Sequence, residues 1–369
     1  MKITINKEQI ISGLQAVQNI VGSRTTLPVL SNVLLRAEGN RLELTSTDLD
    51  ISIIAVVTAT VLVPGATTVP AKRFFGIVRE LPTPEIELEV DDHHVCSLQS
   101  GASYYKINGM AAEEFPPVIR FVEEQKIVFD QALIKGMLRK TSFAMSTDES
   151  RYVLNGIFFS IKEHKMIMVA TDGRRLALAE SDIEVTAEQQ NDFIVPTKAI
   201  NELSRLLQAA GQLEVRRTPN QVAFTLLDDK GGSIQMISKL VDGTYPNYRQ
   251  VIPGETKERI ALGREEFLQA LRRAEFMTSD KSNSVKLTFG NNNLGITANA
   301  PEVGEGRESL AINYQGKEMG IAFNPAYLMD PLKALDNDEV FFELIDELSP
   351  GVIKINGPFL YVLMPMRTN

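Results

Sequence analysis

The chain has 369 residues, of which 44% are hydrophobic and 23% charged, and its formal net charge is −9. This length predicts two or three domains, and the acidic balance argues against a simple basic nucleic-acid binder. The single cysteine, Cys96, excludes an internal disulfide and suits a reducing compartment. Because the opening MKITINKEQI lacks the apolar core of a signal peptide, we expect a soluble cytoplasmic protein.

Three segments share one pattern, a short β-like stretch followed by a helix-period stripe of apolar residues, at 3–17, 127–141 and 260–274. A second helix is expected after a strand ending in Val-Pro at 69–81 and 195–207, and 323–335 is the third counterpart with Pro325 one residue later. Alternating hairpins lie between the two helices of each unit, at 31–53, 154–178 and 285–300. Self-similarity of this kind indicates repeated domains.

The longest apolar run, ISIIAVVTATVLV at 51–63, is shorter than the ~20 residues that a membrane helix needs. It is rich in β-branched residues and ends at Pro64-Gly65, so we predict one buried strand. The whole pattern predicts an α+β protein of three repeated domains, each with two helices packed on antiparallel sheets of six to eight strands. The expected boundaries give domains at 1–120, 121–253 and 254–369.

The segment VATDGRRLALAE at 169–180 has two interpretations. Asp172 with Arg174 and Arg175 resembles the acid–base group and anion clamp of a hydrolase. A Thr-Asp pair also occurs at Thr47-Asp48, in the same place of the first repeat, which favours a structural turn. Since the three repeats share no acidic pair, we expect no catalytic residue, and the Gly-Arg-Arg that follows the second turn needs another explanation.

DDHHVC at 91–96 is the best metal-site candidate, with two carboxylates, two imidazoles and a thiol within six residues. It lies between two alternating stretches, however, and adjacent side chains on extended backbone point to opposite faces. We therefore predict a solvated hairpin tip. No P-loop, GxGxxG or HExxH occurs, and we expect neither a metal nor a cofactor.

Basic residues recur on the polar sides of the expected helices. A basic residue on one helix usually means only a solvated face, but recurrence in an acidic protein indicates one positively charged surface. Twelve helices, each ~10 Å wide, standing in a ring would enclose a hole of ~28 Å, and B-form DNA is roughly 20 Å across. Two chains joined head to tail would thus fit around a duplex and contact its phosphates without reading sequence. The residues are Lys7, Lys72, Arg73, Arg79, Lys135, Arg139, Lys140, Lys198, Arg205, Arg264, Arg272, Arg273 and Lys333.

The chain resembles the bacterial DNA polymerase III beta subunits, the sliding clamps, from end to end. The resemblance rests on RTTLPVLSNVLL (24–35), RYVLNGIFF (151–159), ATDGRRLA (170–177), YPNYRQVIP (245–253) and YVLMPMR (361–367). It implies the DNA clamp fold and a homodimeric ring that encircles duplex DNA and tethers the replicative polymerase, with no catalysis of its own. It also implies as partners the clamp loader, the polymerase III catalytic subunit and other proteins with a clamp-binding motif, and no membrane.

The resemblance further implies three sets of site residues. For DNA they are Arg24, Arg73, Tyr152 and Lys198. For a partner-peptide cleft they are Leu154, Thr171, Gly173, Arg174, Arg175, Leu176, Pro246, Val251, Asn324, Tyr327, Val362, Leu363, Met364, Pro365, Met366 and Arg367. For the dimer joint they are Tyr104, Tyr105, Phe276, Met277, Glu302 and Glu305.

The chain departs from the family pattern at Gln250, where a basic residue is common, at Ser282, where an apolar one occurs, and in two residues after Arg367. The loop STDES at 146–150 is more acidic than a DNA-contacting loop. A β-rich adhesion or scaffold protein is a remaining alternative. It accounts for the repeats, but not for basic helix faces or for the apolar Met-Pro-Met near the end of the sequence.

Overall fold

The computed structural model describes residues 1–22, 27–118, 121, 126–186, 189–227, 232–254 and 256–367. Contacts divide the chain into two compact units. Unit 1 consists of Met1–Lys135 and Asn201–Leu240, and unit 2 of Gly136–Ile200 and Val241–Asn369. Among the described residues, no helix is long and apolar enough to cross a membrane.

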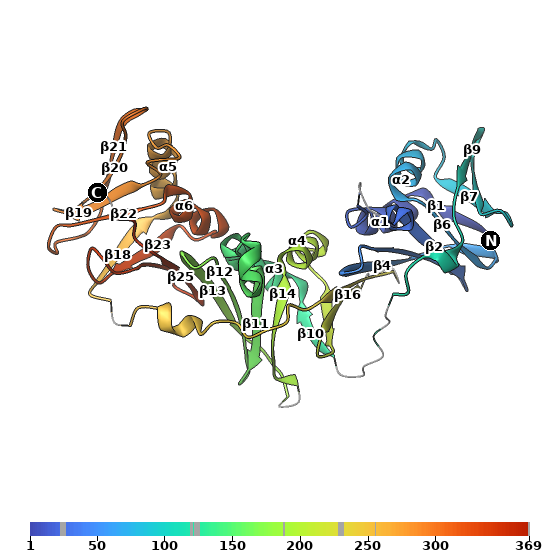
Figure 1. Cartoon of the computed structure of the whole chain (residues 1–369), viewed down its shortest axis with the longest axis horizontal. Coiled ribbons are helices and arrows are strands. Elements are labelled where there is room, and N and C mark those ends of the chain that lie inside the picture. The colour runs from blue at the N-terminus through green and yellow to red at the C-terminus, as the bar shows by residue number, and fades with distance from the viewer. Residues whose placement is uncertain are drawn as a thin grey trace. The chain divides into compact units, whose positions relative to one another are not determined.

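Each repeat contains the two predicted α-helices (Figure 1). They are α1 (Lys7–Val17) and α2 (Ala71–Glu80), α3 (Gln131–Thr141) and α4 (Thr197–Leu206), and α5 (Arg264–Glu275) and α6 (Pro325–Ala334). Their apolar stripes are buried, as at Phe74 and Phe267. The side chain of Asn6 caps α1 and that of Asn324 caps α6, while Pro325 occupies the first turn of α6, where its missing N–H costs nothing.

Unit 1 contains two antiparallel sheets, with strand orders β5-β1-β7-β8-β9 and β10-β15-β16-β17-β4-β3-β2-β6. The first repeat provides β1 (Lys2–Asn6), β2 (Asn32–Glu38), β3 (Arg41–Thr47), β4 (Ile51–Thr58), β5 (Thr60–Val63), β6 (Gly65–Pro70), β7 (Glu85–Val90), β8 (Val95–Ser100) and β9 (Ser103–Asn108). The central repeat provides β10 (Ile127–Asp130), β15 (Gln212–Arg217), β16 (Gln221–Leu227) and β17 (Ser233–Lys239).

The prediction of one buried strand at 51–63 is wrong. The run breaks at Ala59 into β4 and β5, which belong to different sheets. Leu62 and Val63 on β5 are 59% and 49% exposed, because β5 is an edge strand that pairs only with β1. The described part of the first repeat therefore has nine strands, one more than the largest number expected.

Unit 2 contains sheets with strand orders β14-β11-β12-β13-β25-β24-β23-β18 and β21-β20-β19-β22. The central repeat provides β11 (Gly156–Lys162), β12 (Lys165–Thr171), β13 (Arg175–Asp182) and β14 (Asn191–Pro196). The last repeat provides β18 (Glu258–Gly263), β19 (Val285–Gly290), β20 (Asn293–Ala300), β21 (Gly304–Ala311), β22 (Met319–Phe323), β23 (Glu339–Leu344), β24 (Gly351–Lys354) and β25 (Phe359–Leu363).

Each eight-stranded sheet combines strands of two consecutive repeats. In unit 1, β4 of the first repeat pairs with β17 of the central repeat, with Ile53 opposite Met236. In unit 2, β13 of the central repeat pairs with β25 of the last, with Ala177 opposite Tyr361. Main-chain hydrogen bonds therefore run continuously from one repeat into the next within each unit.

Candidate functional site

The two Thr-Asp turns have the same hydrogen bonds, which confirms that the turn is a repeated structural element. In the second turn, the Thr171 hydroxyl donates to the Arg175 carbonyl at 2.6 Å and accepts from the Gly173 N–H at 3.1 Å. Asp172 Oδ1 accepts from the N–H groups of Arg174 and Arg175 at 2.9 and 3.1 Å. In the first turn, the hydroxyl of Thr47 and the carboxylate of Asp48 make the same four bonds.

Gly173 distinguishes the second turn from the first. Both turns need a residue in the left-handed region, with φ of +86° at Gly173 and +78° at Leu49. A Cβ at residue 173 would also lie 2.7 Å from the Arg151 guanidinium. Glycine adopts this conformation without the strain that Leu49 carries, and the flexible Arg151 side chain lies beside the turn.

Arg175 lies beside this turn and is almost enclosed, since its side chain is only 10% exposed. Its guanidinium donates to Asp172 Oδ2 at 3.1 Å, to the Phe143 carbonyl at 2.6 Å and to Asp330 Oδ2 on α6. It also lies over the Tyr327 ring, 4.2 Å from the centroid. Arg175 thus links the turn of the central repeat to α6 of the last repeat.

The pKa of Arg175 reflects these partners. Burial by itself lowers the pKa, but nearby Tyr361 and the carboxylates of Asp330 and Asp172 outweigh burial, so the pKa is raised. Burial raises the pKa of the Tyr361 hydroxyl, which donates to the Tyr327 carbonyl at 2.8 Å. The raised pKa values of Arg175 and Tyr361 keep the guanidinium charged and the phenol neutral, so these contacts act as a structural lock.

The C-terminal segment lies directly beside the turn. Arg175 is opposite Leu363 in the β13·β25 pairing, and the Met364 N–H donates to the Arg174 carbonyl at 3.0 Å. Two residues later the Met366 N–H donates to the Ala322 carbonyl of β22 at 2.7 Å. The tail therefore crosses from one sheet of the last repeat to the other.

Apolar residues form the base of this region and line its rim. Leu154, Leu176 and Val362 belong to one buried cluster with Tyr245 and Tyr248. Among the residues predicted for the cleft, Val251, Met364 and Met366 are 50%, 46% and 39% exposed, and Gly173, Arg174, Pro246 and Arg367 are also exposed. The structure places all sixteen predicted cleft residues in unit 2.

Leu348 is a site candidate that the sequence analysis missed. It is 84% exposed in the hairpin between β23 and β24, which Asp346 stabilises by accepting from the Leu348 and Ser349 N–H groups. Gly351, at the start of β24, pairs with Leu363, so this hairpin tip adjoins Met364. No sequence periodicity marks an exposed leucine in a turn, and only the strand register could reveal it.

Comparison with known proteins identifies the family. Models of the N-terminal, central and C-terminal domains of the DNA polymerase III beta subunit match residues 1–119, 128–247 and 249–367. The chain belongs to the DNA polymerase III beta subunit family. The resemblance and the clamp fold predicted from sequence are thereby confirmed.

Relatives match over their full length. The chain is 34% identical to the beta sliding clamp of Chlamydia muridarum over 100% of this chain and 99% of that protein. It is 36% identical to the beta sliding clamp of Escherichia coli over 100% of both. The crystal structure of the Bacillus subtilis DNA polymerase sliding clamp superimposes with a TM-score of 0.94, at 30% identity and with 100% of both chains covered. As a beta sliding clamp, the chain is a non-catalytic processivity subunit.

The residues that the clamp resemblance predicts for DNA are on helical segments. Arg73 on α2, Lys198 on α4 and Tyr152 between Glu149 and Leu154 are exposed, Tyr152 by 59%. Arg24 lies outside the described residues. In the acidic loop, Asp148 accepts from the Ser150 N–H and hydroxyl at 3.0 and 2.7 Å, so this carboxylate caps the short helix that carries Tyr152.

Three basic residues of the helices bond to main-chain carbonyls at helix ends, a role that the sequence pattern does not show. Lys7 donates to the Leu81 carbonyl after α2, Lys135 to Leu207 after α4, and Arg264 to Leu332 in the last turn of α6. A cation at a helix C-terminus satisfies open carbonyls and opposes the helix dipole. Part of the basic bias therefore follows from this repeated cap and not from a ligand.

The residues expected at the dimer joint of a clamp lie on two edge regions. Tyr104 and Tyr105 on β9 are 54% and 46% exposed. Phe276, just after α5, is 77% exposed, and Met277 contacts Gly306 on β21. Glu302, in the turn before β21, accepts a hydrogen bond from Ser279. Glu305, on β21, lies 3.5 Å from the Arg307 guanidinium.

The DDHHVC segment is the predicted hairpin tip, between β7 and β8. Asp91 Oδ1 accepts from the His93 and Val95 N–H groups at 2.9 Å each, and His94 has a φ of +60°. The carboxylate is thus used by the turn itself. In the part of the chain that the structure describes, no group of three or more potential metal ligands gathers.

Proposed function

We propose that two copies of this chain form a closed ring around duplex DNA in the cytoplasm. The ring is opened and closed by a clamp loader and tethers the polymerase III catalytic subunit and other proteins with a clamp-binding motif. Family membership supports DNA and a polymerase as partners. We further propose domains at 1–120, 121–253 and 254–369. The observation that carries the ring is a pair of matching sheet edges.

The repeats show how one domain joins the next. β9, β17 and β25 occupy equivalent positions in their repeats, and so do β4, β13 and β21. Within the chain, β4 pairs with β17 and β13 pairs with β25. β9 is equivalent to β17 and β25, and β21 is equivalent to β4 and β13, but β9 and β21 are edge strands that have no such partner within the described chain. An exposed edge is a template for another strand, so β21 of one copy pairs with β9 of the next.

The register of this joint follows from the two internal pairings. When the hydrogen-bonded residue pairs are followed from strand to strand in each repeat, Tyr105 on β9 occupies the same position as Met236 on β17 and Tyr361 on β25. Gly306 likewise corresponds to Ile53 and Ala177, the residues opposite them. The equivalent pairing sets Tyr105 opposite Gly306 of the partner subunit.

Two further observations support the register. Met236 and Tyr361 are fully buried, whereas Tyr105 is 46% exposed, as expected for a joint that one chain cannot complete. Phe143, just after α3, packs on Tyr361 with ring centroids 5.6 Å apart. Phe276 occupies the same position after α5, so it meets Tyr105 across the joint. Lys106 then lies opposite Glu305, which adds an attractive cross-strand pair.

For DNA, we propose contacts by Arg73, Tyr152 and Lys198, together with Arg24. Their exposure supports contact with phosphates, and the mixture of cations and one aromatic ring suits backbone contact better than base recognition. Such binding weakens with salt and shows little sequence preference. Retention then depends on topology, because the ring leaves DNA only at an end.

For partner proteins, we propose that an extended peptide containing a glutamine and spaced apolar residues lies in the cleft between the Thr-Asp turn and the tail. The exposed Gly173 and the exposed, adaptable Met364 and Met366 support this. Arg367 and Arg174 are exposed and contact the peptide. Arg175 acts indirectly, by holding the turn against α6, because its side chain is enclosed by other partners.

Two experiments test the ring. Native mass spectrometry should give a dimer that stays on closed circular duplex after loading and leaves linear duplex. A wild-type monomer at micromolar concentration, or equal retention on both DNAs, would contradict the proposal. The register is tested by mild oxidation of Lys106→Cys/Glu305→Cys, which should cross-link into covalent dimers. The control Lys106→Cys/Arg307→Cys is displaced by two residues, about 7 Å along the strand, and should cross-link far less.

A further inference from the structure

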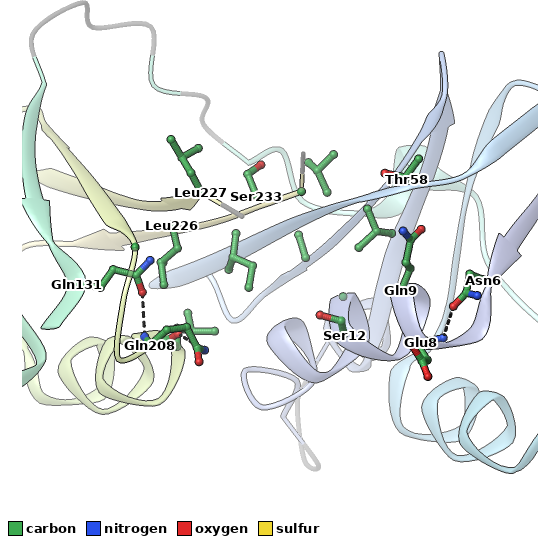
Figure 2. A pocket seen from close by; sticks show the side chains of 18 of the residues that line it. Asn6, Glu8, Gln9, Ser12, Thr58, Gln131, Gln208, Leu226, Leu227 and Ser233 are labelled. Atoms are coloured by element: carbon green, nitrogen blue, oxygen red, sulfur yellow. Dashed lines mark hydrogen bonds between the residues drawn. The ribbon is translucent and has the colours of Figure 1, made fainter. Parts of the chain in front are cut away.

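Unit 1 contains a cavity of about 630 Å³ that the clamp function does not use (Figure 2). It lies where the first and central repeats meet: α1 and β4 come from the first repeat, and β16, β17 and the segment after α4 come from the central one. The volume is in the range of pockets that hold drug-sized ligands. Any ligand in this cavity contacts both repeats at once.

The floor of the cavity is a row of aliphatic side chains across three strands. Ala55 on β4 pairs with Ile234 on β17, which pairs with Leu226 on β16. Neighbouring strands lie about 4.8 Å apart, so this row is about 10 Å wide. Such a floor accommodates one branched aliphatic or aromatic group and excludes water from beneath it.

The walls carry amides and hydroxyls. Gln9 and Ser12 project from α1 on one side, and Gln131 and Gln208 lie on the other (Figure 2). Gln131 is already engaged: its Oε1 accepts from the Gln208 N–H at 2.8 Å, and its Nε2 donates to the Gln212 carbonyl. Within the described residues, the side chains of Gln9 and Ser12 make no hydrogen bond, so both are available to a ligand.

Charge is nearly absent from this site. Of the described residues that line it, only Glu8 is charged, and it is exposed on the rim. Recognition of a phosphate, a carboxylate or a nucleic acid relies on several cations, and this cavity offers none among those residues. The occupant that fits is neutral, with an apolar group for the floor and amide donors and acceptors for the walls.

We propose that this cavity is a second binding site for an uncharged, peptide-like ligand. Its apolar group rests on Ala55, Ile234 and Leu226, and its amides hydrogen-bond to Gln9 and Ser12. The site is separate from the partner-peptide cleft, which lies wholly in unit 2. The proposal does not depend on ring formation, because every described residue that lines the cavity belongs to unit 1 of one chain.

The only native cysteine permits a direct test, because Cys96 is fully buried and does not compete for thiol reagents. Ser12→Cys, in the otherwise native chain, is equilibrated with two cysteamine disulfides in the presence of 2-mercaptoethanol. One probe carries N-acetylleucine and the other carries N-acetylglutamate. The matched control is Gln269→Cys, at the same position of α5. Intact-mass spectrometry measures capture.

We expect Ser12→Cys to capture the leucine probe at least tenfold better than Gln269→Cys does, and tenfold better than it captures the glutamate probe. Filling the cavity from its floor with Ala55→Leu should lower capture to the control level. Ala210→Phe, in the exposed loop, is the second filling variant should Ala55→Leu fold poorly. Equal capture at the two cysteines, preference for the charged probe, or capture that survives filling would each overturn the proposal.

Discussion

Replacing Arg175 by Met should loosen the Thr-Asp turn and α6 together. The substitution leaves Asp172 and Asp330, whose side chains are 16% and 26% exposed, without their cation. It also removes the donor to the Phe143 carbonyl and the stacking on Tyr327. Removing one partner of a largely buried ion pair costs about 3–5 kcal/mol. Because water reaches both carboxylates and Asp172 keeps its main-chain hydrogen bonds, we expect a free-energy cost at the lower end of this range.

Hydrogen exchange is the suitable assay, since a chain of several domains does not unfold in two states. A local loss of about 3 kcal/mol speeds exchange roughly 150-fold, and we expect this for amides at 172–178 and 325–334. Arg174→Met is the matched control, because Arg174 is exposed and its side chain has no hydrogen bond among the described residues. Equal exchange in the two variants would refute the conclusion that Arg175 holds the turn against α6.

Three other predictions concern separate parts of the molecule. Phe276→Asp should yield monomers in sedimentation experiments, because it introduces a charge where Tyr105 of the partner subunit packs; an unchanged dimer would count against the joint. Leu49→Gly should raise the melting temperature, because glycine relieves a φ of +78° worth about 1 kcal/mol, and a lower melting temperature would show that the half-exposed leucine contributes more than the strain. Burial raises the pKa of the Cys96 thiol to about 12. In the unfolded chain that pKa is about 8.5, so stability relative to Cys96→Ala should be constant below pH 8.5 and then fall by about 1.4 kcal/mol per pH unit. A difference that does not change with pH would contradict the buried, neutral thiol.

Local patterns in the sequence predicted the helices and the repeats well. The apolar stripes gave α1, α3 and α5, and the Val-Pro signals gave α2 and α4, because helix periodicity and breakers act over a few residues. The two Thr-Asp turns were also matched correctly, since a short polar turn carries its own hydrogen bonds. The prediction for the apolar run at 51–63 is wrong because a strand that changes sheets has the same composition as one that does not.

Long-range partners were beyond the reach of these patterns. Nothing near Arg175 in sequence shows that Asp330, 155 residues away, receives its guanidinium, so the residue looked available for a peptide. For Lys7, Lys135 and Arg264, likewise, nothing nearby in sequence shows that each donates to a carbonyl at the end of another helix. A charged residue in sequence shows only that a charge must be satisfied, and its partner is decided by the tertiary fold.

Because β4 pairs with β17, one edge of the first repeat waits for its partner while the rest of the chain is translated. β4 ends at Thr58 and β17 begins at Ser233, so the ribosome adds about 175 residues between them, which takes on the order of 10–35 s at typical elongation rates. From the completion of β9 at Asn108 until β17 is made, the nascent first repeat has its own strands, but the β4 edge lacks the partner that covers it in the finished chain. A newly made chain therefore depends on its own later segment, arriving in time, to cover an edge that neighbouring nascent chains on the same messenger could otherwise occupy.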